Sequence, residues 1–251
     1  MNRPIFRWSI LALSLLSFSG CSTPPADNSK SYKSAKVHTE LASLYYQRSQ
    51  MGIALDELTQ ALNADPDYAP AYNMRGLVHM SLREDKDAEA DFKKSLSLDD
   101  MDSDTHNNYG WFLCQRGREN ESIPQFMAAI KNPLYPTPVR AYLNAGLCSR
   151  KAGNNKDAED FLKRALILQP GLTQANFALA ELSFAEGDYS AARRYFVNFS
   201  KNSDGLTAEQ LWLGVRISRK TGDRISEGSY SMQLRNRYPD AHETQLLSSG
   251  E

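Results

Sequence analysis

The sequence lacks the residue patterns that mark a catalytic or metal site. No GxSxG, P-loop or GxGxxG motif occurs in its 251 residues. The four histidines, His38, His79, His106 and His242, have no HxxxH or CxxC partner, so no metal-ligand spacing is present. Carboxylates are abundant but show no paired arrangement beyond exposed helix faces. The sequence therefore predicts no catalytic residue, no metal and no cofactor, and it argues against an enzyme.

Charge of one sign is also lacking, because the formal net charge is −1. Without residues 1–20, which include Arg3 and Arg7, 27 Lys and Arg face 30 Asp and Glu, a net charge of −3. No basic field is present that would attract nucleic acid or an anionic lipid surface. We therefore expect no nucleic-acid partner.

No apolar run is long enough to span a bilayer, which takes about 20 residues. The longest run, WSILALSLLSF, follows two arginines and ends at Phe18, directly before Ser19-Gly20-Cys21. This order resembles a bacterial lipoprotein signal with its lipobox, although Leu is commoner than Phe at position 18. The resemblance implies that residues 1–20 are removed and that Cys21 is acylated. A plain secretory signal with a chance cysteine is the alternative.

The residue after Cys21 is Ser22 rather than Asp, which in enteric-type sorting favours the outer membrane, here its periplasmic face. The next stretch, STPPADNSKSYKS, is polar and rich in Pro and Ser. Such a composition cannot build a core, so residues 21–34 are expected to form a flexible tether.

Small residues recur with a period of about 34. The spacings are 34, 34, 36, 34 and 34, and the residues are Ala42, Gly76, Gly110, Gly146, Ala180 and Gly214. Twelve positions after each comes a second small residue: Ala54, Ala88, Ser122, Ala158, Ala192 and Ser226. Four positions further comes a bulky one: Leu58, Phe92, Phe126, Leu162, Phe196 and Tyr230.

This pattern resembles the tetratricopeptide repeat. The resemblance implies an all-α, right-handed superhelical solenoid whose first helices line the inner wall. Six units are expected, at residues 35–68, 69–102, 103–138, 139–172, 173–206 and 207–240, followed by a short tail at 241–251. The physical reason is that Gly or Ala lets the two helices of a unit approach closely, and that no unit can bury its apolar face alone.

Two stretches depart from the repeat pattern. KNPLYPTPVR, at residues 131–140, holds three prolines and accounts for the spacing of 36. DDMDSD, at residues 99–104, has aspartates at calcium-loop spacing, but Thr105 and Trp111 stand where that loop needs Gly and Glu. We interpret these aspartates as acidic residues at a helix N-terminus, where the helix dipole favours them.

Aromatic, apolar and amide residues fall at the positions expected to face the inner wall. Rings supply contact area and amides hold main-chain groups, so this wall is predicted to capture a peptide. The candidate groove residues are Tyr46, Asn73, Leu77, Asn107, Trp111, Leu143, Leu147 and Phe177. The alternative for Trp111 is that its ring only packs on the neighbouring helix.

Cys114 and Cys148 fall on the first helices of adjacent units. Adjacent first helices pack side by side, and an exported protein meets an oxidising compartment, so a disulfide is favoured. Two separately buried thiols are the alternative.

A lipobox followed by six such repeats resembles the type IV pilus biogenesis and stability lipoproteins of the PilF/PilW family, the pilotins of the pilus secretin. NNYGWFLCQRGR and AYLNAGLC look like the third and fourth repeats of that family. The resemblance implies binding to secretin subunits and help with their localisation and multimerisation, which supports pilus biogenesis and twitching motility. The alternative function is an envelope-assembly scaffold for porin insertion or cell-wall synthesis.

Overall fold

The computed structural model describes residues 30–249. This part of the chain forms thirteen α-helices and no strand, so the predicted all-α class is confirmed. The helices are α1 (Lys30–Gln47), α2 (Met51–Ala64), α3 (Ala69–Leu82), α4 (Asp85–Leu98), α5 (Ser103–Gln115), α6 (Glu119–Lys131), α7 (Pro138–Lys151), α8 (Asn155–Leu168), α9 (Thr173–Ala185), α10 (Tyr189–Lys201), α11 (Ala208–Thr221), α12 (Arg224–Arg237) and α13 (His242–Ser249).

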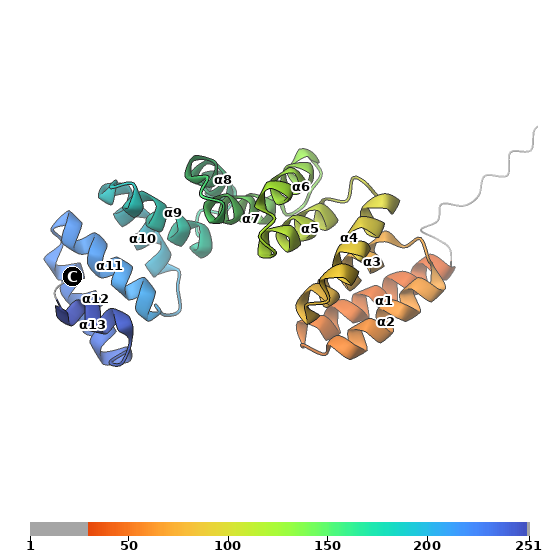
Figure 1. The fold of residues 1–251 in the computed structure, drawn as a ribbon, viewed down its shortest axis with the longest axis horizontal. Helices are drawn as coiled ribbons and strands as arrows, with labels where there is room; N and C mark the ends of the chain where they lie inside the picture. The colour runs from red at the N-terminus through yellow and green to blue at the C-terminus, as the bar shows by residue number, and fades with distance from the viewer. Residues whose placement is uncertain (1–29, 250–251) are drawn as a thin grey trace, which may run out of the picture.

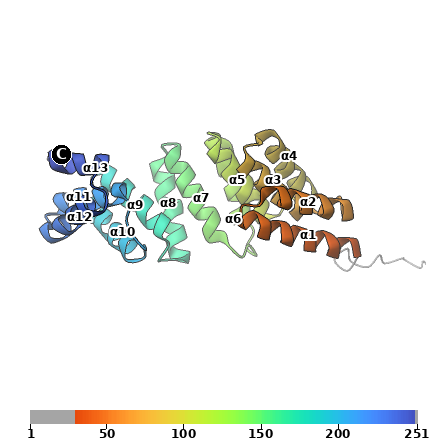
Figure 2. The same cartoon turned by 90° about the horizontal axis from the view of Figure 1, so that it is seen from below.

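Helices α1 to α12 form six consecutive hairpins, and each hairpin packs on the next. The chain describes an arch with α1–α4 at one end and α11–α13 at the other (Figure 1), and it is elongated in the perpendicular view (Figure 2). The first helices α1, α3, α5, α7 and α9 also contact one another in turn. They therefore form one continuous wall of the solenoid.

Each hairpin closes where a small residue meets a bulky one. A Cβ on Gly110 would lie 2.8 Å from the ring of Phe126, and a Cβ on Gly76 would lie 2.8 Å from the ring of Phe92. Both rings are completely buried. The missing side chain therefore lets the ring of the second helix lie directly on the backbone of the first helix.

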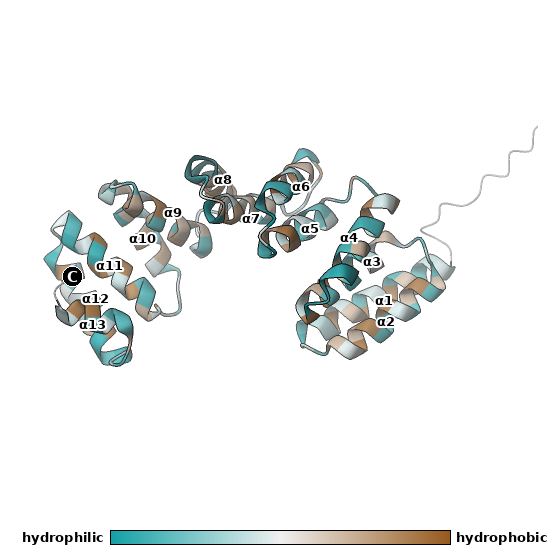
Figure 3. Ribbon diagram, in the orientation of Figure 1, coloured by the Kyte–Doolittle hydropathy of each residue, from teal (hydrophilic) through white to brown (hydrophobic). Residues whose placement is uncertain are grey.

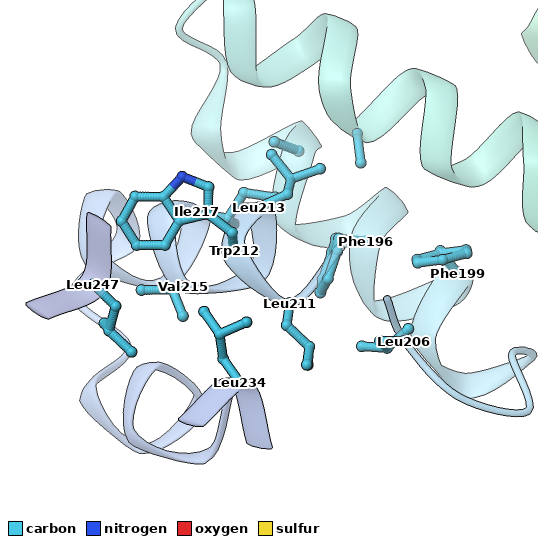
Figure 4. Packing of buried hydrophobic residues seen from close by; sticks show 12 residues of the cluster. Phe196, Phe199, Leu206, Leu211, Trp212, Leu213, Val215, Ile217, Leu234 and Leu247 are labelled. Atoms are coloured by element: carbon cyan, nitrogen blue, oxygen red, sulfur yellow. The ribbon is translucent and has the colours of Figure 1, made fainter. Parts of the chain in front are cut away.

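Hydrophobic residues form stripes along the helices rather than covering them (Figure 3), as expected of helices that pack on only part of their surface. The buried side chains fall into successive clusters along the solenoid. In the C-terminal cluster, Phe196, Leu211 and Leu234 come from α10, α11 and α12 and belong to one buried group (Figure 4). Such a chain of local cores is the packing of a repeat protein, in which each unit depends on its neighbours.

Two terminal segments differ from expectation. Helix α1 begins at Lys30, so residues 30–34, expected in the tether, are helical; the ring of Tyr32 meets that of Tyr68 edge-on at 5.3 Å. The tail forms α13, which packs on α11 and α12 and buries Leu247. Both extensions cover apolar surface that an end repeat would otherwise expose. The predicted signal peptide, Cys21 and residues 21–29 lie outside the described part.

Candidate functional site

The inner wall holds a groove of about 450 Å³ near the middle of the arch. Its walls come from the first helices α1, α3, α5, α7 and α9 and from the turn before α9. The lining residues are Tyr46, Leu77, Asn107, Asn108, Trp111, Val139, Arg140, Leu143, Asn144, Gln169, Leu172 and Gln174. The groove combines apolar side chains with amides and contains one cation and no carboxylate among the described residues.

Hydrogen-bonded asparagines cross three hairpins beside this groove. The amide of Asn108 donates to the side chain of Asn73 at 3.0 Å, and the amide of Asn144 donates to that of Asn107 at 3.0 Å. Asn107 is buried, whereas Asn108 and Asn144 remain partly exposed. The asparagines therefore fix the spacing of α3, α5 and α7 and leave amide groups at the surface for a bound chain.

Trp111 has two sets of neighbours. It lines the groove, and it also packs against the buried cluster of Cys114, Cys148 and Phe126. Part of the indole is therefore held by the core, and the rest faces the groove. A ring held in this way loses little conformational freedom when it binds a partner.

Cys114 on α5 and Cys148 on α7 form a disulfide, with their Cα atoms 5.9 Å apart. Both are buried, and the Ser122 hydroxyl lies 2.9 Å from the sulfur of Cys148. The bond joins two neighbouring first helices directly behind Trp111. It therefore braces the wall on which the groove is built.

The predicted groove residues divide into three groups. Five of them, Tyr46, Leu77, Asn107, Trp111 and Leu143, line the groove. Asn73 lines a neighbouring hollow of about 270 Å³ that shares Leu77 with the groove.

The other two candidates do not line this groove and are partly buried beside core clusters. Leu147 packs on the cluster between α7 and α9, and the ring of Phe177 lies 4.9 Å from that of Phe199. Leu147 therefore packs toward α8 and α9, and Phe177 packs toward α10 of its own hairpin.

Several lining residues were not expected from the sequence. Asn108 and Asn144 share one repeat position, next to the one chosen for Asn107 and Leu143, so a comparison of both positions would have found them. Gln169 and Leu172 come from the turn between α8 and α9, which a pattern of first helices does not include.

The strongest shifts in pKa lie on the other side of α5, away from the groove. Hydrogen bonds from the Arg118 guanidinium lower the pKa of Glu89 to about 2. Hydrogen bonds from Lys93 and Tyr109 lower it further, whereas partial burial acts in the opposite direction. Burial and the same carboxylate raise the pKa of Tyr109 to about 12. This network joins α4 to α5 and α6, so it holds neighbouring hairpins together.

The described helices give no sign of a metal centre or a membrane span. Within residues 30–249, no group of three His, Cys, Asp or Glu side chains could hold a metal ion. None of the helices in this part of the chain is long and apolar enough to cross a bilayer.

Comparison with known proteins identifies the repeats and similar full-length chains. A tetratricopeptide repeat family model matches residues 39–104 and 113–173, about half of the chain. The chain is 29% identical over 244 residues to the type IV pilus assembly protein PilF of Pseudomonas aeruginosa PAO1, covering 95% of this chain and 96% of that protein.

Solved structures show the same similarity. The structure of Pseudomonas aeruginosa PilF superposes with a TM-score of 0.84 at 28% identity, covering 89% of this chain and 100% of PilF. PilW, described as a widely conserved type IV pilus biogenesis factor, superposes with a TM-score of 0.76 at 33% identity, covering 85% of this chain and 97% of PilW.

Proposed function

Because the chain belongs to the tetratricopeptide repeat family, and within it to the group that contains PilF and PilW, we propose that it is an outer-membrane lipoprotein that binds the type IV pilus secretin and promotes its localisation and multimerisation. The similarity along nearly the whole chain supports a role in pilus biogenesis. The groove on the inner wall supports the secretin-binding part of the proposal, because it is the surface suited to another polypeptide.

The chemistry of the groove favours an extended, apolar segment of a secretin subunit. Leu77, Trp111 and Leu143 offer apolar area, and Asn108 and Asn144 offer donors and acceptors to main-chain groups. A volume of about 450 Å³ holds a few side chains of such a segment. Tryptophan is the residue type that most often dominates a protein interface, so Trp111 is the proposed anchor.

The lipid anchor supplies the second half of the mechanism. Acylation of Cys21 would hold the solenoid at the periplasmic face of the outer membrane, with the residues before α1 as the tether. Each buried CH₂ of an acyl chain contributes about 0.8 kcal/mol, so several chains on one cysteine anchor stably. Secretin subunits bound to anchored solenoids share one surface, which raises their effective concentration for multimerisation.

Trp111→Ala tests the groove. We expect the Kd for purified secretin subunits to rise by about tenfold or more, because a central ring is lost from the contact. Phe161→Ala is the matched control: Phe161 packs on the same disulfide cluster but does not line the groove. Phe161→Ala should destabilise the protein about as much as Trp111→Ala does, and it should leave the Kd for secretin subunits unchanged. Equal Kd values for wild type and Trp111→Ala would exclude the groove as the binding site.

Cys21→Ala tests the anchor in the same system. The variant should fold and bind secretin subunits normally, yet a deletion strain complemented with it should accumulate fewer secretin multimers in the outer-membrane fraction. Normal multimers with this variant would remove the anchor from the mechanism. Normal multimers in the deletion strain itself would favour a different envelope partner.

A further inference from the structure

Arg216 on α11 occupies a repeat position that is buried and apolar in the four preceding hairpins. The position lies two residues after the small residue of each first helix, and the residues there are Val78, Phe112, Cys148 and Leu182. A charged side chain costs free energy at such a position unless it is paired. Residues that break the pattern of their fold in this way are expected at functional sites.

Aromatic rings hold the guanidinium of Arg216. Its Cζ atom lies 4.8 Å from the centre of the Phe184 ring on α9 and 6.0 Å from that of the Trp212 ring, one turn earlier on α11. Trp212 is 8% exposed, and Phe184 is partly exposed. Contacts between a cation and ring faces offset part of the cost of burying the charge. They also fix the orientation of the guanidinium.

No carboxylate neutralises this cation. Arg216 forms no ion pair and no hydrogen bond of its side chain within residues 30–249. Two carboxylates on the flanking helices already have partners: Glu227 of α12 pairs with Arg219 at 2.7 Å, and Glu181 of α9 pairs with Arg150. The charge of Arg216 is therefore available to a ligand.

The burial of single atoms decides which donors of Arg216 a ligand can reach. The Nε atom is buried without a partner, whereas the two terminal nitrogens are not buried in this way. The accessible donors are therefore the N–H groups of Nη1 and Nη2, which lie side by side at the end of a planar fork. A carboxylate accepts two parallel hydrogen bonds from such a pair of donors. Because the rings hold the fork in place, little conformational freedom is lost on binding.

A second cation follows one turn later on the same helix. The Nζ atom of Lys220 lies 5.7 Å from the centre of the Tyr189 ring at the start of α10. Lys220 pairs with no carboxylate in the described helices, and Glu186 and Asp188 in the turn before Tyr189 also form no ion pair with it. Arg216 and Lys220 together therefore favour a negatively charged ligand.

We propose that Arg216 and Lys220 form a docking site for a glutamate or aspartate side chain of a partner protein, separate from the groove. Gln174, which lines the groove, lies at the start of α9, and Phe184 lies near its end, about 15 Å away along the helix axis. The site is at the opposite end of the arch from α1, which follows the proposed lipid anchor (Figure 1). This position suits a protein segment better than a lipid headgroup.

A peptide titration of the full-length protein in detergent tests the site. The probe is acetyl-Ala-Glu-Ala-amide, and the readout is the indole N–H resonance of Trp212 in protein labelled with ¹⁵N at its tryptophans. We expect a saturable shift of this resonance, because the ring contacts the Arg216 guanidinium, while that of Trp111 in the groove stays in place. The same peptide with glutamine in place of glutamate should bind about tenfold more weakly, which corresponds to about 1.4 kcal/mol.

Substitutions assign the two cations. Arg216→Met restores an apolar side chain at this repeat position, so it should raise the Kd of the glutamate peptide about tenfold or more without lowering the midpoint of urea unfolding. Arg216→Lys keeps the charge but not the fork and should give a Kd between those of wild type and Arg216→Met. Lys220→Gln should raise the Kd by a smaller factor than Arg216→Met. Arg235→Gln, which removes a cation from the exposed face of α12, is the control and should leave the Kd unchanged.

Three results would each overturn the proposal: no shift at Trp212, equal affinity for the glutamine peptide, or unchanged affinity in Arg216→Met. Inorganic phosphate is a second probe. A shift at Trp212 with phosphate and none with the glutamate peptide would assign the site to phosphate groups, such as those of lipids, and would exclude a protein partner. Raising the ionic strength from about 0.1 M to about 1 M shortens the Debye length from about 10 Å to about 3 Å, so peptide binding should weaken. Insensitivity to salt would point to ring contacts alone and would also exclude the proposed site.

Discussion

Single residues decide how closely the two helices of a hairpin approach. Gly110 and Gly228 are both helical glycines, but they meet different surroundings. A Cβ on Gly110 would lie 2.8 Å from the ring of Phe126, whereas one on Gly228 would have no atom within 4 Å. The same substitution should therefore have opposite effects at the two positions.

Gly110→Ala should destabilise the protein by up to about 2 kcal/mol, the difference between the overpacking cost and the gain in helix propensity. Overpacking against a buried ring costs about 1–3 kcal/mol, which outweighs a gain in helix propensity of about 1 kcal/mol. Gly228→Ala should gain about 0.5–1 kcal/mol. Urea unfolding followed by circular dichroism measures both. A stabilising Gly110→Ala would show that the Phe126 ring can move aside at little cost.

At the scale of elements, charged side chains join neighbouring hairpins. Glu89 on α4 accepts from Arg118 before α6 at 2.8 Å and from Tyr109 on α5 at 2.9 Å. The folded state lowers the pKa of Glu89 from an ordinary 4.5 to about 2. A lowered folded pKa means that the carboxylate contributes stability above pH 4.5 and that this contribution is lost as the pH falls from 4.5 to about 2.

Glu89→Gln should therefore destabilise the protein at neutral pH and matter little near pH 2. We expect a loss of about 1 kcal/mol at pH 7, reduced from the full linkage value because the side chain is 23% exposed to screening solvent. Thermal unfolding across this pH range measures the difference. Glu159→Gln, in an exposed pair with Lys163 on α8, is the control and should give a smaller difference. A constant gap between wild type and Glu89→Gln at all pH values would contradict the assignment.

At the scale of the whole molecule, the disulfide ties the two halves of the arch. Cys114 and Cys148 are 34 residues apart and enclose α6 and the proline-containing connection. The hairpins of a solenoid touch only their neighbours, so a weak junction would lower the cooperativity of the whole array. The covalent bond strengthens the contact where the repeat spacing is irregular.

Cys114→Ala with Cys148→Ala should lower the free energy of unfolding by about 3–4 kcal/mol in the loop-entropy model. The variant should also unfold over a broader range of urea concentration, because the two halves of the arch would then unfold at different urea concentrations. Wild type treated with a reducing agent is the matched comparison and should behave like the variant. Identical unfolding curves for oxidised and reduced wild type would show that the bond does not brace the junction.

Part of this architecture can be predicted from the order of residues. Glycine recurs where a Cβ would meet a bulky side chain of the paired helix, at Gly76, Gly110, Gly146 and Gly214. The spacing of these glycines therefore indicates where the two helices of each hairpin cross. Two terminal segments were less predictable. The helical start at Lys30 and helix α13 follow from apolar surface that the end hairpins leave uncovered, and the sequence of either segment by itself is too short and polar to indicate a helix.

The order of residues was enough to predict how the helices pair and five of the twelve residues that line the groove, because the 34-residue period records which side chains meet inside each hairpin. The packing of the folded chain was needed to show that Leu147 and Phe177 do not line the groove, that Asn108 and Asn144 border it, and that residues 99–104 meet residues 132–136. The reason is physical: contacts between hairpins depend on how each is rotated against the next, and that rotation comes from the packing of whole helices.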